Sequence, residues 1–221
     1  RGYRRARAPL ASCAASAFPF APGQCLHNET CNVWTHAPVF LYFARYCRAR
    51  YHPATRLVAG AAALTFGTST YAHLMCAHSK RAACDLFRAD KSCIALFGAA
   101  ASAACAMVHF TARGEIKTRN AVLLGMAAAF LKACHGTYTG QTAGDSQAKT
   151  LAIFVAQYSL GFLVCCREVL TQKDANTRRI VLYHVLMSAG CALAGGAHFA
   201  TFFPERLAPG WCDAIGSSHN V

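Results

Sequence analysis

The chain has 221 residues, of which 55% are hydrophobic and only 14% charged, and its formal net charge is +13. A soluble domain usually carries about 25% charged residues, so this composition disfavours a soluble globular protein. The basic residues lie between apolar runs and are not interleaved with stacking aromatics, which favours loops near anionic lipid over a nucleic-acid surface. The 13 cysteines include no C-x-x-C pair, and many lie in or beside apolar runs, which makes a disulfide framework unlikely.

Six apolar segments follow one another along the chain, roughly at 33–47, 57–78, 92–110, 121–139, 150–166 and 180–203. The second contains no Lys, Arg, Asp or Glu, and as a helix it would be about 33 Å long, enough to cross a bilayer. Faces rich in Ala and Gly suit close helix contacts in lipid. We therefore predict an all-α polytopic membrane protein, a seven-transmembrane helix bundle. Its seventh span would start near Asp213 and be truncated at Val221.

The stretch HNETCNVWTH (27–36) before the first apolar segment has three interpretations. Its Asn-Glu-Thr triplet fits the N-glycosylation sequon. His27, Glu29 and His36 could be metal ligands or acid/base groups. Alternatively, the stretch is an interfacial collar in which Trp34 lies at the headgroups and the polar side chains cap a helix.

Alternation of the spans assigns polar residues to membrane faces, although the basic residues are too evenly divided to give an orientation. Ser69 and His73 share a helix face at i, i+4 spacing, so the hydroxyl can orient the imidazole. Ionisable groups at membrane depth cost a few kcal/mol each and are usually functional or paired. One membrane face is predicted to collect His27, Glu29, His36, Ser69, His73, His78, Asp85, Asp90 and His219. The scattered residues His52, His109 and His184 are interpreted as structural.

Four motifs occur in the order found in a known family: HNETCNVWTH, STYAHLMCAHSK at 69–80, Asp90 after a further short loop, and PERLAPGWCDAIGSSHNV at 204–221. On these residues the chain resembles the progestin and adipoQ receptor (PAQR) family, which is related to haemolysin-III-like proteins and alkaline ceramidases. The GYR opening and NVWTH lean toward the membrane progestin receptor branch, and the GSSH ending resembles the Golgi-resident branch. The resemblance implies a basic N-terminal segment, 1–26, and a PAQR-like membrane domain, 27–221, incomplete at its C-terminus.

The resemblance also implies a buried zinc ion. His73 matches the ligand on the second span, and His219 matches the first ligand of an H-x-x-x-H pair whose second histidine would fall beyond the chain end. Ser69 matches the serine one turn before the first ligand, and Asp90 matches the acid that holds the water at the metal. Three protein ligands plus a water are typical of catalytic zinc. The family therefore implies hydrolysis of a lipid amide such as ceramide, with Asp90 as general base or water-orienting group.

Two departures from the family pattern weaken the catalytic prediction more than the fold prediction. Lys91 follows Asp90 where an aromatic residue is usual, and it could pair with the acid and make it a poorer proton shuttle. Ala37-Pro38 follow NVWTH where leucines are usual. In the family the zinc face is usually cytosolic, which would leave the sequon unused. Glu29, Thr30 and Asn32 are then interpreted as capping and loop-ordering groups.

Three functions remain open. The chain could be a receptor for a lipid or steroid-like ligand or for a secreted hormone, a zinc-dependent lipid amidase, or a non-catalytic Golgi scaffold. A G-protein-coupled receptor is disfavoured because the third span ends in MVHFTARG, without an Asp-Arg-Tyr motif. We expect a multi-pass protein of the plasma membrane or Golgi, with a cytosolic N-terminus and no nucleic-acid partner.

Overall fold

The computed structural model describes residues 10–18, 29–139, 147–201, 203 and 206–207, and it shows no β-strand within them. The helices are α1 (Leu10–Ala15), α2 (Thr30–Ala44), a 3-10 turn η1 (Arg45–Cys47), α3 (Pro53–Met75), α4 (Lys80–Ala112), α5 (Ile116–Thr139), α6 (Gln147–Thr171) and α7 (Ala175–Thr201). Each predicted apolar segment matches one of helices α2 to α7, which confirms the all-α prediction. The predicted seventh span lies outside the described residues.

Local sequence determines where helices α3 and α4 begin. Pro53 occupies the first turn of α3, and His52 Nδ1 accepts the backbone N–H of Ala54 at 3.2 Å. The Ser79 hydroxyl caps α4 by accepting an N–H of its first turn at 3.0 Å. This cap starts α4 well before the predicted apolar run 92–110. Asp90 consequently lies inside the helix and not in a loop that precedes it.

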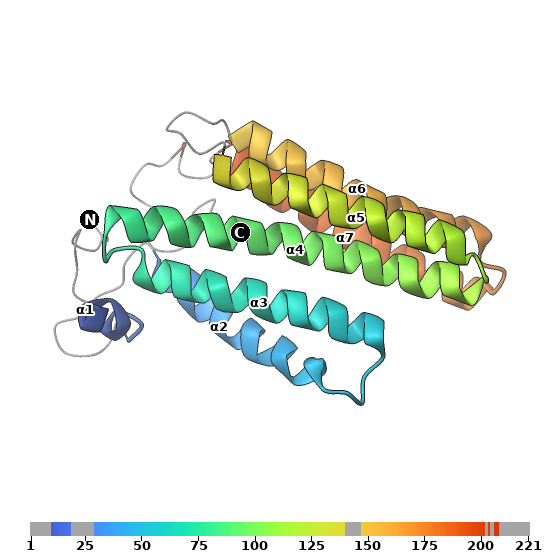
Figure 1. The fold of residues 1–221 in the computed structure, drawn as a ribbon, viewed down its shortest axis with the longest axis horizontal. Coiled ribbons are helices and arrows are strands. Elements are labelled where there is room, and N and C mark those ends of the chain that lie inside the picture. Colours follow the sequence, from blue (N-terminus) through green and yellow to red (C-terminus); the bar gives the residue numbers. More distant parts are fainter. Residues whose placement is uncertain (1–9, 19–28, 140–146, 202, 204–205, 208–221) are drawn as a thin grey trace.

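Helix α4 lies in the middle of the bundle, between the α2–α3 pair and the group formed by α5, α6 and α7 (Figure 1). Its contacts with α3 and α6 use small side chains, which let helix backbones approach closely. A Cβ built on Gly98 would lie 2.7 Å from the Tyr158 ring, and one on Gly161 would lie 2.9 Å from Ser102 Cα. The buried alanines of α3 and α4 include Ala59, Ala62, Ala72, Ala95, Ala100 and Ala106.

Within the described part of the chain, four helical stretches are long and apolar enough to cross a membrane: Lys80–Ala112, Ile116–Tyr138, Phe154–Thr171 and Ala175–His198. Large apolar side chains point outward from these helices, among them Leu124, Leu131, Leu163, Leu170 and Leu193. Such exposure would be a liability in water and suits a lipid-facing surface. The predicted first two spans correspond to α2, which has 15 residues, and to α3, which carries several Ser and Thr, and neither is in this group.

The close contact between α4 and α6 predicts that a larger side chain at Gly161 destabilises the fold. A Gly161→Ala substitution places the new methyl 2.2 Å from Ser102 Oγ and should destabilise the fold by about 1–3 kcal/mol through overpacking. Gly190→Ala is the matched control, because a Cβ there meets nothing within 4 Å and alanine favours the helix by about 1 kcal/mol. Thermal unfolding in detergent should show a lower midpoint for the first variant only. Equal midpoints would mean that α4 and α6 are not in contact at this position.

Candidate metal-binding site at one end of the bundle

The start of α2 and the end of α3 meet through a carboxylate and an imidazole. Glu29 Oε2 lies 2.6 Å from His73 Nδ1, and both side chains are largely buried. Glu29 occupies the N-cap position of α2, yet its side chain makes no cap hydrogen bond. The interpretation of Glu29 as a capping group is therefore wrong, because its carboxylate is directed to the histidine of α3.

Asn32 completes this contact from one turn further along α2, where it is almost fully buried. Its Nδ2 donates to Glu29 Oε2 at 3.1 Å and lies 3.3 Å from His73 Nδ1. The two contacts at Nδ1 cannot both be strong, because an amide N–H and a ring N–H are both donors. The shorter, charge-assisted contact assigns the proton to Nδ1, which donates to Glu29. Asn32 therefore steadies the carboxylate and belongs to the site, not to a loop-ordering cap.

His36 and Ser69 form the adjoining part of the cluster. Ser69 Oγ lies 3.3 Å from His36 Nδ1, and the ring centroids of His36 and His73 are 5.8 Å apart. The ring of Phe87 contacts His73 edge-on, with a centroid distance of 5.3 Å. Ser69 of α3 thus contacts His36 of α2, and Phe87 of α4 packs against the ring of His73.

Asp90 brings a second carboxyl group to the cluster from α4. It is 8% exposed, hydrogen-bonds Ser69 and lies within electrostatic range of His73. Its Oδ1 is buried and has no hydrogen-bond partner among the residues that the structure describes. A buried, unpaired carboxylate oxygen is costly and commonly marks the place of a water or an ion. No ion pair within the described residues joins Asp90 to Lys91, although the charge of Lys91 lies within electrostatic range of the Asp90 carboxyl group.

The remaining predicted members of the polar face have different positions. Asp85 is exposed and lies 3.8 Å from Arg81 and 3.6 Å from Arg88, so it belongs to the surface of α4. His78 lies in the bend between α3 and α4. His27 and His219 fall outside the described residues.

The cluster contains donors that suit zinc. A metal-ligating histidine commonly has its other ring nitrogen held by a carboxylate, and His73 has this arrangement with Glu29. The orphaned oxygen of Asp90 adds a candidate partner for water beside it. Among residues 29–139 and 147–201 no group of three or more His, Cys, Asp or Glu is arranged to hold a metal. Zinc binding at this cluster therefore stays a prediction, with which the Glu29–His73 pair is compatible.

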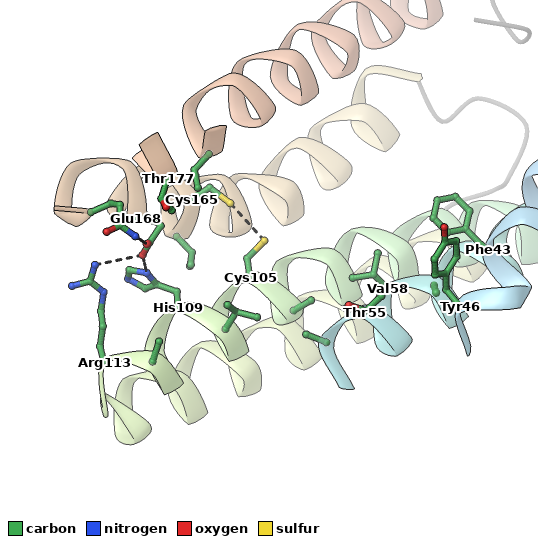
Figure 2. Close-up of a pocket in the computed structure, with 18 of the residues that line it drawn as sticks. Phe43, Tyr46, Thr55, Val58, Cys105, His109, Arg113, Cys165, Glu168 and Thr177 are labelled. Carbon is green, nitrogen blue, oxygen red and sulfur yellow. Dashed lines mark hydrogen bonds and ion pairs between the residues drawn. The ribbon is translucent and has the colours of Figure 1, made fainter. Parts of the chain in front are cut away.

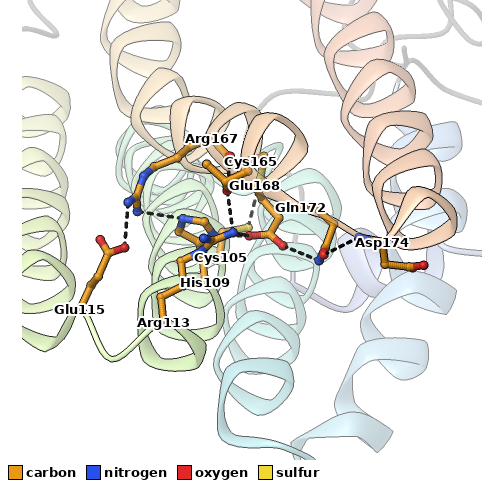
Figure 3. A network of polar contacts seen from close by, with 10 residues as sticks. Cys105, His109, Arg113, Glu115, Cys165, Arg167, Glu168, Gln172 and Asp174 are labelled. Atoms are coloured by element: carbon orange, nitrogen blue, oxygen red, sulfur yellow. Dashed lines mark hydrogen bonds and ion pairs between the residues drawn. The ribbon is translucent and has the colours of Figure 1, made fainter.

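A second polar network lies at the other end of α4, 19 residues and roughly 28 Å along the helix from Asp90. His109 Nδ1 contacts Glu168, while Arg167 donates to His109 Nε2 at 3.0 Å and to Glu115 at 2.8 Å (Figure 3). An arginine can only donate, so Nε2 is the acceptor and Nδ1 carries the proton. The hydrogen bond from Arg167 lowers the pKa of Glu115, which lies in the loop after α4.

An apolar cavity of about 960 Å³ adjoins this network, between α2, α3, α4, α6 and α7 (Figure 2). Phe43, Val58 and Val164 contribute apolar walls, while His109 and Glu168 lie at its polar end. Its volume is in the range of sites for small molecules. The sequence interpretation of His109 as structural is compatible with its buried pairing, but nothing in the sequence predicted the cavity.

The sequence analysis placed Glu29 and His36 on the same membrane face as Ser69 and His73, and the contacts confirm this convergence. It interpreted Asn32 only as a capping or loop-ordering group. The i, i+3, i+7 spacing of Glu29, Asn32 and His36 could have identified Asn32 as a member of the cluster. Asn32 was missed because the first apolar segment was predicted to begin at residue 33. Extending the helix by one turn brings the three side chains onto the face that meets α3.

Apolar helices with outward-facing leucines and a buried polar cluster at one end define a multi-pass helical membrane protein. The family model of the haemolysin-III-related proteins matches residues 24–221. The chain belongs to this family, which confirms the predicted PAQR relationship. Heptahelical transmembrane protein 1 of Arabidopsis thaliana is 24% identical over 214 residues, covering 88% of this chain. The chain spans 64% of the length of that curated relative.

The geometry predicts different effects for two substitutions on zinc content of the purified full-length protein. His73→Ala should abolish stoichiometric zinc, because it removes the ligand that the family resemblance implies. Glu29→Gln should keep zinc but weaken its affinity by about 10–100-fold, because an amide holds the imidazole less strongly than a carboxylate. His184→Ala, an exposed position on α7, serves as control and should retain the metal. Full zinc affinity in both site variants would show that this cluster holds no metal.

Proposed function

We propose that this protein is a zinc-dependent hydrolase of lipid amides. The observation that carries the proposal is the buried pairing of Glu29 with His73 beside the orphaned Asp90 Oδ1. Hydrogen-bonded imidazole and a carboxylate with a vacant acceptor position are the groups that metal-assisted hydrolysis requires. The family resemblance supports the lipid amide as substrate class, since alkaline ceramidases are among the related proteins.

Glu29 and Asn32 have positioning roles in this proposal. Glu29 accepts the Nδ1 proton of His73, which fixes the tautomer and leaves Nε2 as the basic nitrogen. Asn32 donates to the same carboxylate and restricts its rotation. A fixed imidazole loses less freedom when it binds a ligand, so this pairing favours tight binding. His219 would contribute from the chain beyond the described helices.

Asp90 and Ser69 are the proposed groups of the chemical step. Asp90 Oδ1 can accept a proton from the attacking water and later return it to the leaving amine. Ser69 donates to the same carboxyl group and so restricts its rotation. Bound zinc would supply a lowered pKa for water and polarisation of the amide carbonyl. The aromatic ring of Phe87 packs edge-on against the imidazole of His73.

An Asp90→Asn variant separates binding from chemistry. The amide is nearly isosteric but cannot act as a base, so turnover of a ceramide in nanodiscs should fall by roughly 100-fold or more while zinc content remains. Asp85→Asn, on the exposed side of the same helix, is the matched control and should retain activity. Undiminished turnover in Asp90→Asn would contradict the proposed base. No turnover by the wild-type protein with zinc bound would favour a non-catalytic scaffold.

A second candidate function is a receptor for an uncharged hydrophobic ligand, favoured by the apolar cavity at the opposite end. The polar network beside it pairs two arginines with two glutamates, so it offers no net charge to an ionic ligand. A steroid-like molecule with a hydrogen-bonding end matches this combination of an apolar wall and a neutral polar end. This function can coexist with hydrolysis, because the two sites lie at opposite ends of α4.

Filling the cavity should eliminate such binding. A Val58→Trp substitution occupies the wall of the cavity and should weaken saturable binding of a neutral steroid probe to membranes by at least about tenfold, or 1.4 kcal/mol. Leu57→Trp is the matched control, because Leu57 is partly exposed and does not line the cavity. Equal affinities in the two variants would exclude this cavity as the binding site.

A further inference from the structure

The contact between α4 and α6 follows a regular series of residue pairs. Gly98 meets the Tyr158 ring, Ser102 meets Gly161, and His109 meets Glu168. Between the last two pairs lie Cys105 of α4 and Cys165 of α6. These positions recur every three or four residues on each helix, so they form a single seam along which the two helices are packed.

The two cysteines face one another across this seam. Cys165 Sγ lies 3.6 Å from Cys105 Sγ, and Figure 2 shows the two sulfur atoms directed at each other from separate helices. Both residues line the apolar cavity of about 960 Å³ and are only partly buried. A small molecule that enters the cavity therefore reaches both sulfur atoms. Cys166, the next residue along α6, does not line the cavity.

A disulfide between Cys105 and Cys165 requires a close approach of helices α4 and α6. A disulfide requires Cα atoms about 4.4–6.8 Å apart, which is closer than most packed helices approach. The absent side chain of Gly161 permits this approach, since a Cβ there would lie 2.9 Å from Ser102 Cα. One turn beyond the cysteines, the contact between His109 and Glu168 also holds α4 against α6. The sulfur atoms need to move together by about 1.5 Å to bond, which small side-chain rotations can supply.

We propose that Cys105 and Cys165 are an oxidation site, at which a hydroperoxide converts the two thiols to a disulfide. One thiolate attacks the peroxide oxygen, which gives a sulfenic acid and releases water or an alcohol after protonation. The second thiol then attacks this sulfur, so that the S–S bond forms, the S–O bond breaks, and water leaves. The two sulfur atoms are oxidised by two electrons in total, and the peroxide is reduced by two.

The disulfide covalently joins α4 to α6 at the wall of the cavity. The cysteines are 60 residues apart in sequence, so the bond fixes the helix pair that closes one side of the chamber. Oxidation thus restricts separation of α4 and α6, while reduction leaves their contact dependent on packing. This inference uses neither zinc nor the cluster at the other end, and it stands or falls independently of the proposed hydrolase.

Differential alkylation of the full-length protein in nanodiscs tests the inference. Reduced protein is treated with hydrogen peroxide, remaining thiols are blocked with N-ethylmaleimide, and the disulfides are then reduced and labelled with iodoacetamide. Mass spectrometry should find the second label on Cys105 and Cys165 together, and the first label on Cys166. Before reduction, a linked peptide containing Cys105 and Cys165 should be present. The first label on all three cysteines would overturn the proposal.

Two cysteine variants test whether Cys105 pairs specifically with Cys165. In Cys165→Ser the linked peptide should disappear, whereas Cys166→Ser should retain the full yield of linked peptide. Circular dichroism confirms that each variant keeps its helical content. If Cys105 becomes linked to Cys166 in the Cys165→Ser protein at the wild-type yield, the pairing is unspecific and the proposal fails. The wild-type measurement alone remains decisive if a variant does not fold.

Discussion

The polar end of the bundle depends on the contact between Glu29 and His73. A carboxylate removed from water without a partner would cost several kcal/mol, so its position at the start of α2 requires a donor on the neighbouring helix. His73 supplies that donor at 2.6 Å, and Asn32 supplies a second one at 3.1 Å. The same bond that joins α2 to α3 also fixes the tautomer of the imidazole. The Glu29–His73 bond therefore both holds α2 against α3 and orients the imidazole that is proposed to bind a metal.

The central position of α4 connects this cluster to the rest of the molecule. Its first half presents Asp90 to the histidines of α2 and α3, and its second half presents His109 to α6. Between them, small residues let α3 and α6 pack on either side of the helix. The two ends differ in chemistry. One has a buried carboxyl oxygen without a partner, and the other is a network in which arginines and glutamates are paired and border an apolar cavity.

The sequence was sufficient to predict the helices and the joint location of Ser69, His73 and Asp90. Long uncharged runs and alternation of spans determine those features, because each span reverses direction. The role of Glu29 could not be predicted in the same way. A glutamate just before a helix is ordinarily a capping group, and only the tertiary contact with α3 directs its carboxylate elsewhere. The α4–α6 seam was equally inaccessible, since the sequence does not specify which helices are neighbours.

The most direct test of a zinc site built on the Glu29–His73 pair is the zinc K-edge X-ray absorption spectrum of the purified full-length protein. The site predicts only nitrogen and oxygen neighbours at about 2.0–2.2 Å, as expected for histidine and water ligands. Sulfur neighbours at about 2.3 Å would place the metal among the cysteines, and protein that takes up no zinc would leave the cluster without a metal. Either result would contradict a zinc site at the end of α3.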